Sequence, residues 1–208
     1  MTWNKLFHNE EPSDRYTLNL LLDEGFRLLT EGVAFTQQIL NASNVEKGTT
    51  QFMVQSVDMK KVVEDIAPML KSIAEKKGLK FKVEIGEGDY HVTGDEIQLK
   101  ESIRNIIDNS VYYTPAGTIT VSLARKDDKI IFKVQDTGIG MTDDVKKKLF
   151  TKGGRGKESL LINVNSTGYG LFFVKKVIEA HHGKVHAESE GKDKGSVFTV
   201  ELPEVKHV

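Results

Sequence analysis

Two hairpins constrain the fold of this chain more than any other feature. Residues 118–124 and 129–135 alternate apolar and polar side chains and are joined by a short charged turn, and residues 184–189 and 196–202 form a second pair. Strict alternation is typical of half-buried strands, and a short connection makes neighbouring strands antiparallel. Because helical segments lie between these strands, the sequence predicts an α+β two-layer sandwich, with a mixed sheet and helices on one face. It does not predict a doubly wound parallel sheet.

The spacing of apolar residues predicts the remaining elements. Strand-like alternation marks residues 52–57, 79–85 and 90–92. Helical periodicity marks residues 58–77, 95–112, 142–150 and 168–182. Asp58, Asp95 and Thr142 are placed to cap three of these helices. Between the last two helices, residues 151–166 are rich in Gly, Lys, Ser and Asn, and a loop of this length usually carries a function.

A long helix is predicted to precede the sandwich, from about residue 15 to residue 45. Its seam residues are spaced alternately by four and three: Leu22, Phe26, Leu29, Val33, Thr36 and Leu40. Gly25 and Gly32 lie seven residues apart on an adjoining face, where close approach of a partner helix would offset their low helix propensity. We therefore expect this helix to pack in a bundle, with its own domain or with a second chain.

Composition excludes several classes of protein. The net charge is −1, which gives no reason to expect nucleic acid as a partner. There is no cysteine, so disulfides and cysteine-based metal sites are excluded. The chain also has no apolar run of membrane-spanning length and no signal-peptide pattern at its start.

Two asparagines are the first candidates for a binding site. Asn105 and Asn109 lie one helical turn apart and therefore share a face. An amide oxygen is a hard ligand suited to Mg²⁺, which takes few protein ligands and fills its octahedron with water and phosphate oxygens. The alternative is a pair of surface asparagines without a ligand.

The segment 136–141, Asp-Thr-Gly-Ile-Gly-Met, is the second candidate. Asp136 ends a predicted strand and opens a turn that two glycines permit. A partly desolvated carboxylate at this place is suited to accept the exocyclic amine of adenine. The alternative is a turn-forming aspartate with no ligand.

The last two candidates are suited to phosphate. The loop at 151–166 carries Arg155 and Lys157, which can close over a polyphosphate or simply be solvated. Residues 166–171, Ser-Thr-Gly-Tyr-Gly-Leu, open a helix whose free N–H groups and positive dipole end favour an anion. They do not match the P-loop pattern.

In order and spacing, these features resemble the catalytic ATP-binding domain of sensor histidine kinases. This is the Bergerat-fold superfamily shared with gyrase, the heat-shock chaperone ATPase and MutL. Residues 99–115 resemble its N box, residues 136–141 the G1 box, residues 149–150 the F box and residues 166–171 the G2 box. The resemblance covers about residues 50–205.

The resemblance implies ATP and Mg²⁺ as cofactors. Asn109 would hold Mg²⁺ with Asn105 beside it, and Asp136 would bind the adenine amine. The other implied binding residues are Gly138 and Gly140 in the base pocket, Tyr113 near the base, Arg155 in the ATP lid, and Thr167, Gly168, Gly170 and Leu171 beside the phosphates. The family usually has a phosphate-contacting lysine where this chain has Tyr112, so we expect that contact to be missing.

The long helix is similar to the second helix of the dimerisation and phosphoacceptor hairpin. The resemblance therefore implies a partial dimerisation segment at residues 1–48 and a catalytic domain at residues 49–208. The phosphoacceptor motif itself is missing, because His8 is followed too closely by proline and lies too near the second helix. Two further histidines, His181 and His182, suit the C-terminal end of a helix dipole, and a metal site there is the weaker alternative.

We expect a histidine protein kinase domain that transfers the γ-phosphoryl of ATP to a histidine outside this chain. The implied partners are a response regulator receiver domain, a second copy bound through the N-terminal helix, and an upstream sensor domain. The implied location is the cytoplasm, including the cytoplasmic part of a membrane-bound sensor. Two alternatives remain: a non-catalytic, pseudokinase-like signalling module, and another ATPase or serine kinase of the same superfamily.

Overall fold

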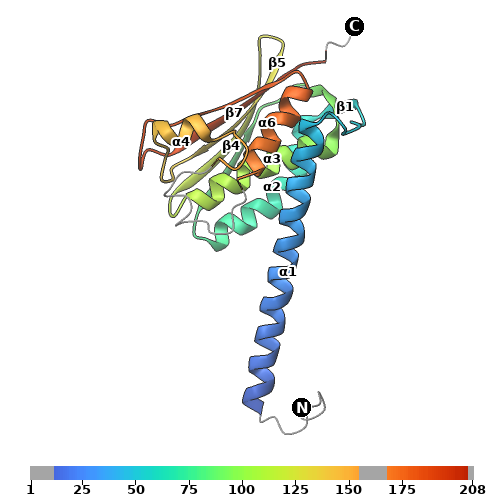
Figure 1. The fold of residues 1–208 in the computed structure, drawn as a ribbon. Helices are drawn as coiled ribbons and strands as arrows, with labels where there is room; N and C mark the ends of the chain where they lie inside the picture. The colour runs from blue at the N-terminus through green and yellow to red at the C-terminus, as the bar shows by residue number, and fades with distance from the viewer. Residues whose placement is uncertain (1–11, 155–167, 206–208) are drawn as a thin grey trace. The chain divides into compact units, whose positions relative to one another are not determined.

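The computed structural model describes residues 12–154 and 168–205. They belong to two compact units, Met1–Leu40 and Asn41–Val208. The elements in chain order are α1 (Pro12–Glu46), β1 (Gln55–Asp58), α2 (Met59–Lys76), β2 (Lys80–Ile85), β3 (His91–Gly94), α3 (Glu96–Tyr113), β4 (Thr118–Lys126), β5 (Lys129–Asp136), α4 (Asp143–Lys148), α6 (Gly170–Ala180), β6 (Lys184–Glu188) and β7 (Ser196–Pro203) (Figure 1).

The first unit holds most of α1, and the predicted apolar seam lies on its surface. Leu22, Phe26, Leu29 and Val33 are each at least 50% exposed. Apart from the backbone of α1 itself, no described atom lies within 4 Å of the place where a Cβ on Gly25 would stand, and the same holds at Gly32. The predicted partner for this face therefore stays a prediction. No described helix is both long and apolar enough to cross a membrane.

The second unit is built on a five-stranded mixed sheet with the order β2-β4-β5-β7-β6. Strand β2 pairs parallel with β4, and the other neighbours pair antiparallel, so both predicted hairpins are confirmed. Strands β1 and β3 form a separate antiparallel pair. The mixed sheet agrees with the fold class predicted from the sequence.

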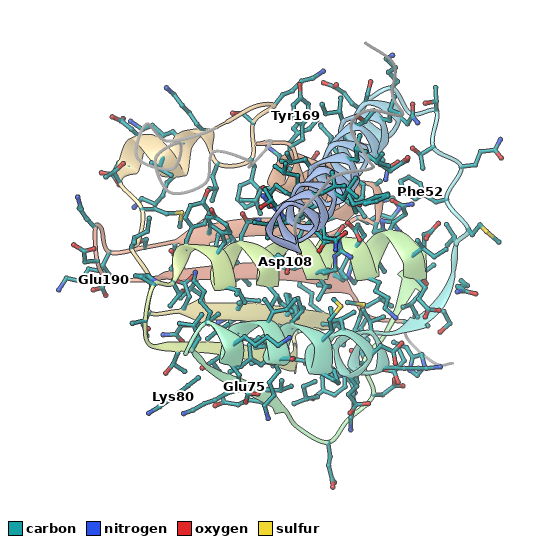
Figure 2. All side chains as sticks on the ribbon, turned by 90° about the horizontal axis from the view of Figure 1, so that it is seen from below. Phe52, Glu75, Lys80, Asp108, Tyr169 and Glu190 are labelled. Atoms are coloured by element: carbon teal, nitrogen blue, oxygen red, sulfur yellow. The ribbon has the colours of Figure 1, made fainter. Side chains whose placement is uncertain are left out.

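Helices cover one face of this sheet. Figure 2 shows α2 and α3 side by side across the strands, and α6 lies against α3 and β6. Alternation along β5 explains the two layers: Ile130, Phe132 and Val134 are buried, whereas Lys133 and Gln135 are exposed. The two-layer sandwich is therefore confirmed, and Asp136 continues the series that faces the helices.

Local capping starts the helices where the sequence predicts. The carboxylate of Asp58 accepts a hydrogen bond from the backbone N–H of Lys60, and the carboxylate of Asp95 accepts one from that of Gln98. These bonds satisfy N–H groups that have no partner within the first turn of a helix.

The strand predicted at residues 52–57 is wrong in its first half, because β1 begins only at Gln55. The backbone N–H of Met53 donates instead to Oδ2 of Asp95, at 2.8 Å, so a carboxylate takes the place of a strand partner. The ring of Phe52 meets the ring of His181 edge-on, with 5.1 Å between centroids. The residues that lead into β1 are thus held by side chains.

Candidate nucleotide-binding site

The two predicted asparagines lie on α3 and are held by backbone carbonyls. Nδ2 of Asn105 donates to the carbonyl oxygen of Glu101 at 2.9 Å, and Nδ2 of Asn109 donates to that of Asn105 at 2.7 Å. Because a carbonyl oxygen only accepts hydrogen bonds, the amide nitrogens must face these carbonyls. Oδ1 of Asn109 is then left as an acceptor. It has no hydrogen-bond partner among the residues that the structure describes.

Asn105 brings α3 to the start of α6. It is 8% exposed, and its Oδ1 lies 3.1 Å from the place where a Cβ on Gly170 would stand, so glycine permits this approach. Tyr169 (labelled in Figure 2) is the N-cap of α6 and makes no side-chain capping bond. The first turn of α6 therefore begins beside Asn105 with no capping bond from the Tyr169 side chain.

Asp136 is 5% exposed and ends β5 on the helix-facing side. Its Oδ1 accepts hydrogen bonds from the backbone N–H groups of Gly138, at 2.9 Å, and Ser196, at 3.2 Å. Burial raises the pKa of this carboxyl, while those two N–H groups and the Ser110 hydroxyl oppose the rise. The Ser110 hydroxyl is near enough to affect the pKa, but it makes no hydrogen bond of ordinary geometry.

The loop after Asp136 is fastened to the end of α3. The backbone N–H of Ile139 donates to the carbonyl oxygen of Tyr113 at 3.1 Å. A Cβ on Gly138 would overlap that carbonyl oxygen and would lie 2.9 Å from Oδ1 of Asp136, so only glycine fits here. The structure thus brings Tyr113 to Asp136 and Gly138, which follow it by more than twenty residues in the sequence.

Gly140 forms a backbone bridge with Lys192, and Leu171 is held by packing in the core. Gly140 has φ +66°, and its backbone lies against Gly191 in the connection between β6 and β7. The Leu171 side chain is 9% exposed and belongs to the hydrophobic core, so any phosphate contact at this position would come from its backbone. Gly168, with φ +68°, comes just before α6. Arg155 and Thr167 lie outside the described residues.

Sequence reasoning missed Ser196 and Ser189. Ser196 lies opposite Asp136 in the β5–β7 register, which becomes known only once the strands are paired. The hydroxyl of Ser189 accepts a hydrogen bond from the backbone N–H of Met141 at 2.9 Å and donates to the carbonyl of Gly195 at 2.7 Å. It therefore ties the 136–141 loop to the last hairpin.

The metal site considered at His181 is wrong. Its Nε2 accepts a hydrogen bond from the backbone N–H of Asp95 at 2.9 Å, and its Nδ1 lies 2.7 Å from the carbonyl oxygen of Val177. Both ring nitrogens are therefore occupied, in a residue that is 5% exposed. The described residues contain no group of three or more His, Asp or Glu side chains placed to hold a metal.

Fold and site together define a nucleotide-binding two-layer sandwich. The sequence model of the histidine kinase-, DNA gyrase B- and HSP90-like ATPases matches residues 94–206, which include the described site residues. The chain belongs to this family.

Similar proteins narrow the class. The circadian input-output histidine kinase CikA of Thermosynechococcus vestitus is 29% identical over 195 residues, covering 92% of this chain and 26% of CikA. We therefore assign the second unit to the ATP-binding catalytic domains of sensor histidine kinases. The chain spans only 25–36% of the length of this CikA and of three further histidine kinases that are similar to it in sequence.

Solved structures share the fold. Full-length ShkA in complex with AMPPNP superimposes with a TM-score of 0.78 at 21% identity, covering 97% of this chain and 41% of ShkA. The nucleotide-free catalytic domain of ThkA gives a TM-score of 0.63 at 22% identity, covering 74% of this chain and 99% of that domain.

Proposed function

We propose that the second unit binds ATP with Mg²⁺ and that Asp136 recognises the adenine amine. The observation that carries this proposal is the unequal state of the two carboxylate oxygens. Oδ1 accepts two backbone hydrogen bonds, whereas no described residue donates one of ordinary geometry to Oδ2. Oδ2 can therefore accept a further hydrogen bond, which the amine of adenine would donate.

Asn109 would hold Mg²⁺. Its Nδ2 is occupied by the Asn105 carbonyl, so the side chain presents an oxygen, the donor atom that Mg²⁺ prefers. Because the described residues offer no acidic cluster, the other ligands would be phosphate oxygens and water. Bound Mg²⁺ would neutralise charge on the phosphates, and Asn105 would support Asn109 from the α6 side.

The remaining assignments follow the resemblance and the geometry together. The backbone at Gly168, Gly170 and Leu171 would face the phosphates, because a helix start without a side-chain cap favours an anion. Gly138, Gly140 and Tyr113 would border the base. Arg155 and Thr167 stay predictions for the lid and the phosphates.

The proposal for the whole protein is transfer of the ATP γ-phosphoryl to a histidine nitrogen outside this chain. From there the phosphoryl would pass to an aspartate on a response regulator receiver domain. Residues 1–48 would self-associate through the exposed face of α1, and a sensor domain would control the reaction. In the described unit, catalysis would consist of positioning and charge neutralisation.

Magnesium dependence tests the site. Calorimetry should show that the chain binds ATP more tightly with Mg²⁺ than with a chelator, and Asn109→Ala should remove most of that difference. The affinity measured with the chelator should change little, because Asn109 is assigned to the metal. If Asn109→Ala lowers the ATP affinity equally with Mg²⁺ and with the chelator, this role is contradicted. If the wild type does not bind ATP, the proposed site is refuted.

A second candidate function is nucleotide binding without transfer, favoured by Tyr112 in place of the expected lysine. Incubating the chain with ATP and a separate helical hairpin that carries an acceptor histidine distinguishes the two functions. Phosphorylation of the hairpin would establish transfer. ATP binding without any phosphorylation of the hairpin would favour the second candidate.

A further inference from the structure

The C-terminal end of α3 is capped by residues from other parts of the fold. A helix leaves its last four carbonyl groups without partners inside the helix. Here the Thr114 hydroxyl donates to the carbonyl of Ser110 at 2.7 Å, and the N–H of Ile139 donates to that of Tyr113 at 3.1 Å. The carbonyls of Val111 and Tyr112 remain, and the last turn of α3 contains no basic residue that could donate hydrogen bonds to them.

Lys77 donates hydrogen bonds to those two carbonyls. Its Nζ donates to the carbonyl oxygen of Val111 at 2.8 Å and to that of Tyr112 at 2.7 Å. The ammonium also lies over the Tyr112 ring, 5.5 Å from the centroid. Burial lowers the pKa of Lys77, while a positive charge at this end of α3 is favoured by the helix dipole.

A continuous series of hydrogen bonds and adjacent residues connects Lys77 to Asp136, at the adenine end of the proposed site. It holds the carbonyls of residues 111 and 112, and the next carbonyl, that of Tyr113, accepts the bond from Ile139. Ile139 lies in the loop whose Gly138 donates to Asp136. A last turn that frays would therefore loosen the attachment of this loop to α3, while its bonds to the last hairpin would remain.

We infer that Lys77 is a positioning residue for the base-binding end of the nucleotide site. It fixes the last turn of α3, and through the Tyr113–Ile139 bond it fixes the loop that presents Asp136. The inference rests on the proposed nucleotide site. Lys77 itself would not contact the nucleotide, so its loss should weaken the binding of adenosine and of ADP by the same factor.

Three variants of the whole chain test this role. Lys77→Met keeps the aliphatic stem and removes the donors, whereas Lys77→Arg keeps two donors and should restore binding. The matched control is Lys76→Met, because the neighbouring Lys76 makes no side-chain hydrogen bond to a described residue. All are compared with wild type by calorimetry well below their unfolding temperatures, and hydrogen exchange is followed at the Ile139 amide.

For Lys77→Met we expect dissociation constants for ADP and for adenosine to rise together, by about three- to thirtyfold. Exchange at the Ile139 amide should quicken, while sheet amides such as that of Val134 should stay protected. Lys77→Arg and Lys76→Met should behave as wild type. If Lys77→Met does not fold, Lys77→Gln is measured in its place and should show the same change, in smaller measure.

A lower unfolding temperature with unchanged affinities and unchanged Ile139 exchange would show a purely structural role and overturn the inference. Weaker binding of ADP with unchanged binding of adenosine would also overturn it, since Lys77 would then act on the phosphates. If the wild type binds neither ligand, the proposed nucleotide site fails and the inference falls with it. Binding by the wild type, unaltered in Lys77→Met, refutes the inference alone.

Discussion

Replacing Asp136 by asparagine should weaken nucleotide binding without weakening the fold. The asparagine oxygen can still accept the bonds from Gly138 and Ser196, which Oδ1 now accepts at 2.9 and 3.2 Å. The other carboxylate oxygen becomes an amide nitrogen, which would meet the adenine amine donor to donor. One buried donor left unpaired costs about 1–3 kcal/mol, so the affinity for ADP should fall by about 5- to 150-fold.

The effect on stability should have the opposite sign. Burial raises the pKa of Asp136 above the ordinary value of 3.8, so ionisation of this group costs the folded state free energy. The stability linked to its proton is present at low pH and is lost as the pH rises through the folded pKa. Asp136→Asn carries no such charge, so at neutral pH it should unfold at the same or a higher urea concentration, and this advantage should shrink in mild acid.

Calorimetry with ADP and urea unfolding at two pH values measure both quantities. Asp144→Asn is the matched control, because Asp144 is exposed on α4 and should change neither quantity. The reasoning is refuted if Asp136→Asn binds ADP as wild type does. It is also refuted if the variant loses stability at neutral pH, since the carboxylate would then be a structural group.

Three further predictions concern single contacts. Asp127 and Asp128 have φ values of 51° and 59° in the β4–β5 turn. Changing the pair to Asn-Gly should therefore stabilise the chain by about 1 kcal/mol in urea unfolding. Hydrogen bonding to Asp89 raises the pKa of His91, so Asp89→Asn should lower it toward 6.5 in an NMR titration; an unchanged pKa would show that the pair does not form in solution. Gly138→Ala should abolish ADP binding in calorimetry, because its Cβ would overlap the Tyr113 carbonyl oxygen.

Features that depend on neighbouring residues could be predicted from the sequence. Alternation in residues 129–135 identified a strand, and the same alternation continues to Asp136, which is why its burial follows from the pattern. Asp58 and Asp95 were identified as caps because a cap acts within three residues. These interactions are local, and the wider fold did not override them.

Features that depend on distant residues could not be predicted. Met53 lies in a strand-like pattern, but the carboxylate of Asp95 takes its N–H. Lys77 follows α2 as its C-cap, and its hydrogen-bond partners lie 34 and 35 residues further along the chain. Ser196 became part of the site only through the pairing of β5 with β7. In each case the partner is selected by the tertiary fold.

The pairing of Ser196 with Asp136 has a consequence for folding. Side chains alternate between the faces of a strand, so a shift of β7 by one residue against β5 would turn Phe198, Val200 and Leu202 toward solvent. It would also take the N–H of Ser196 away from the Asp136 carboxylate. A nucleotide that needs this carboxylate would bind only molecules with the correct strand register and would stabilise them by mass action. In a cell, ATP would thus favour the correctly paired sheet over a misfolded competitor.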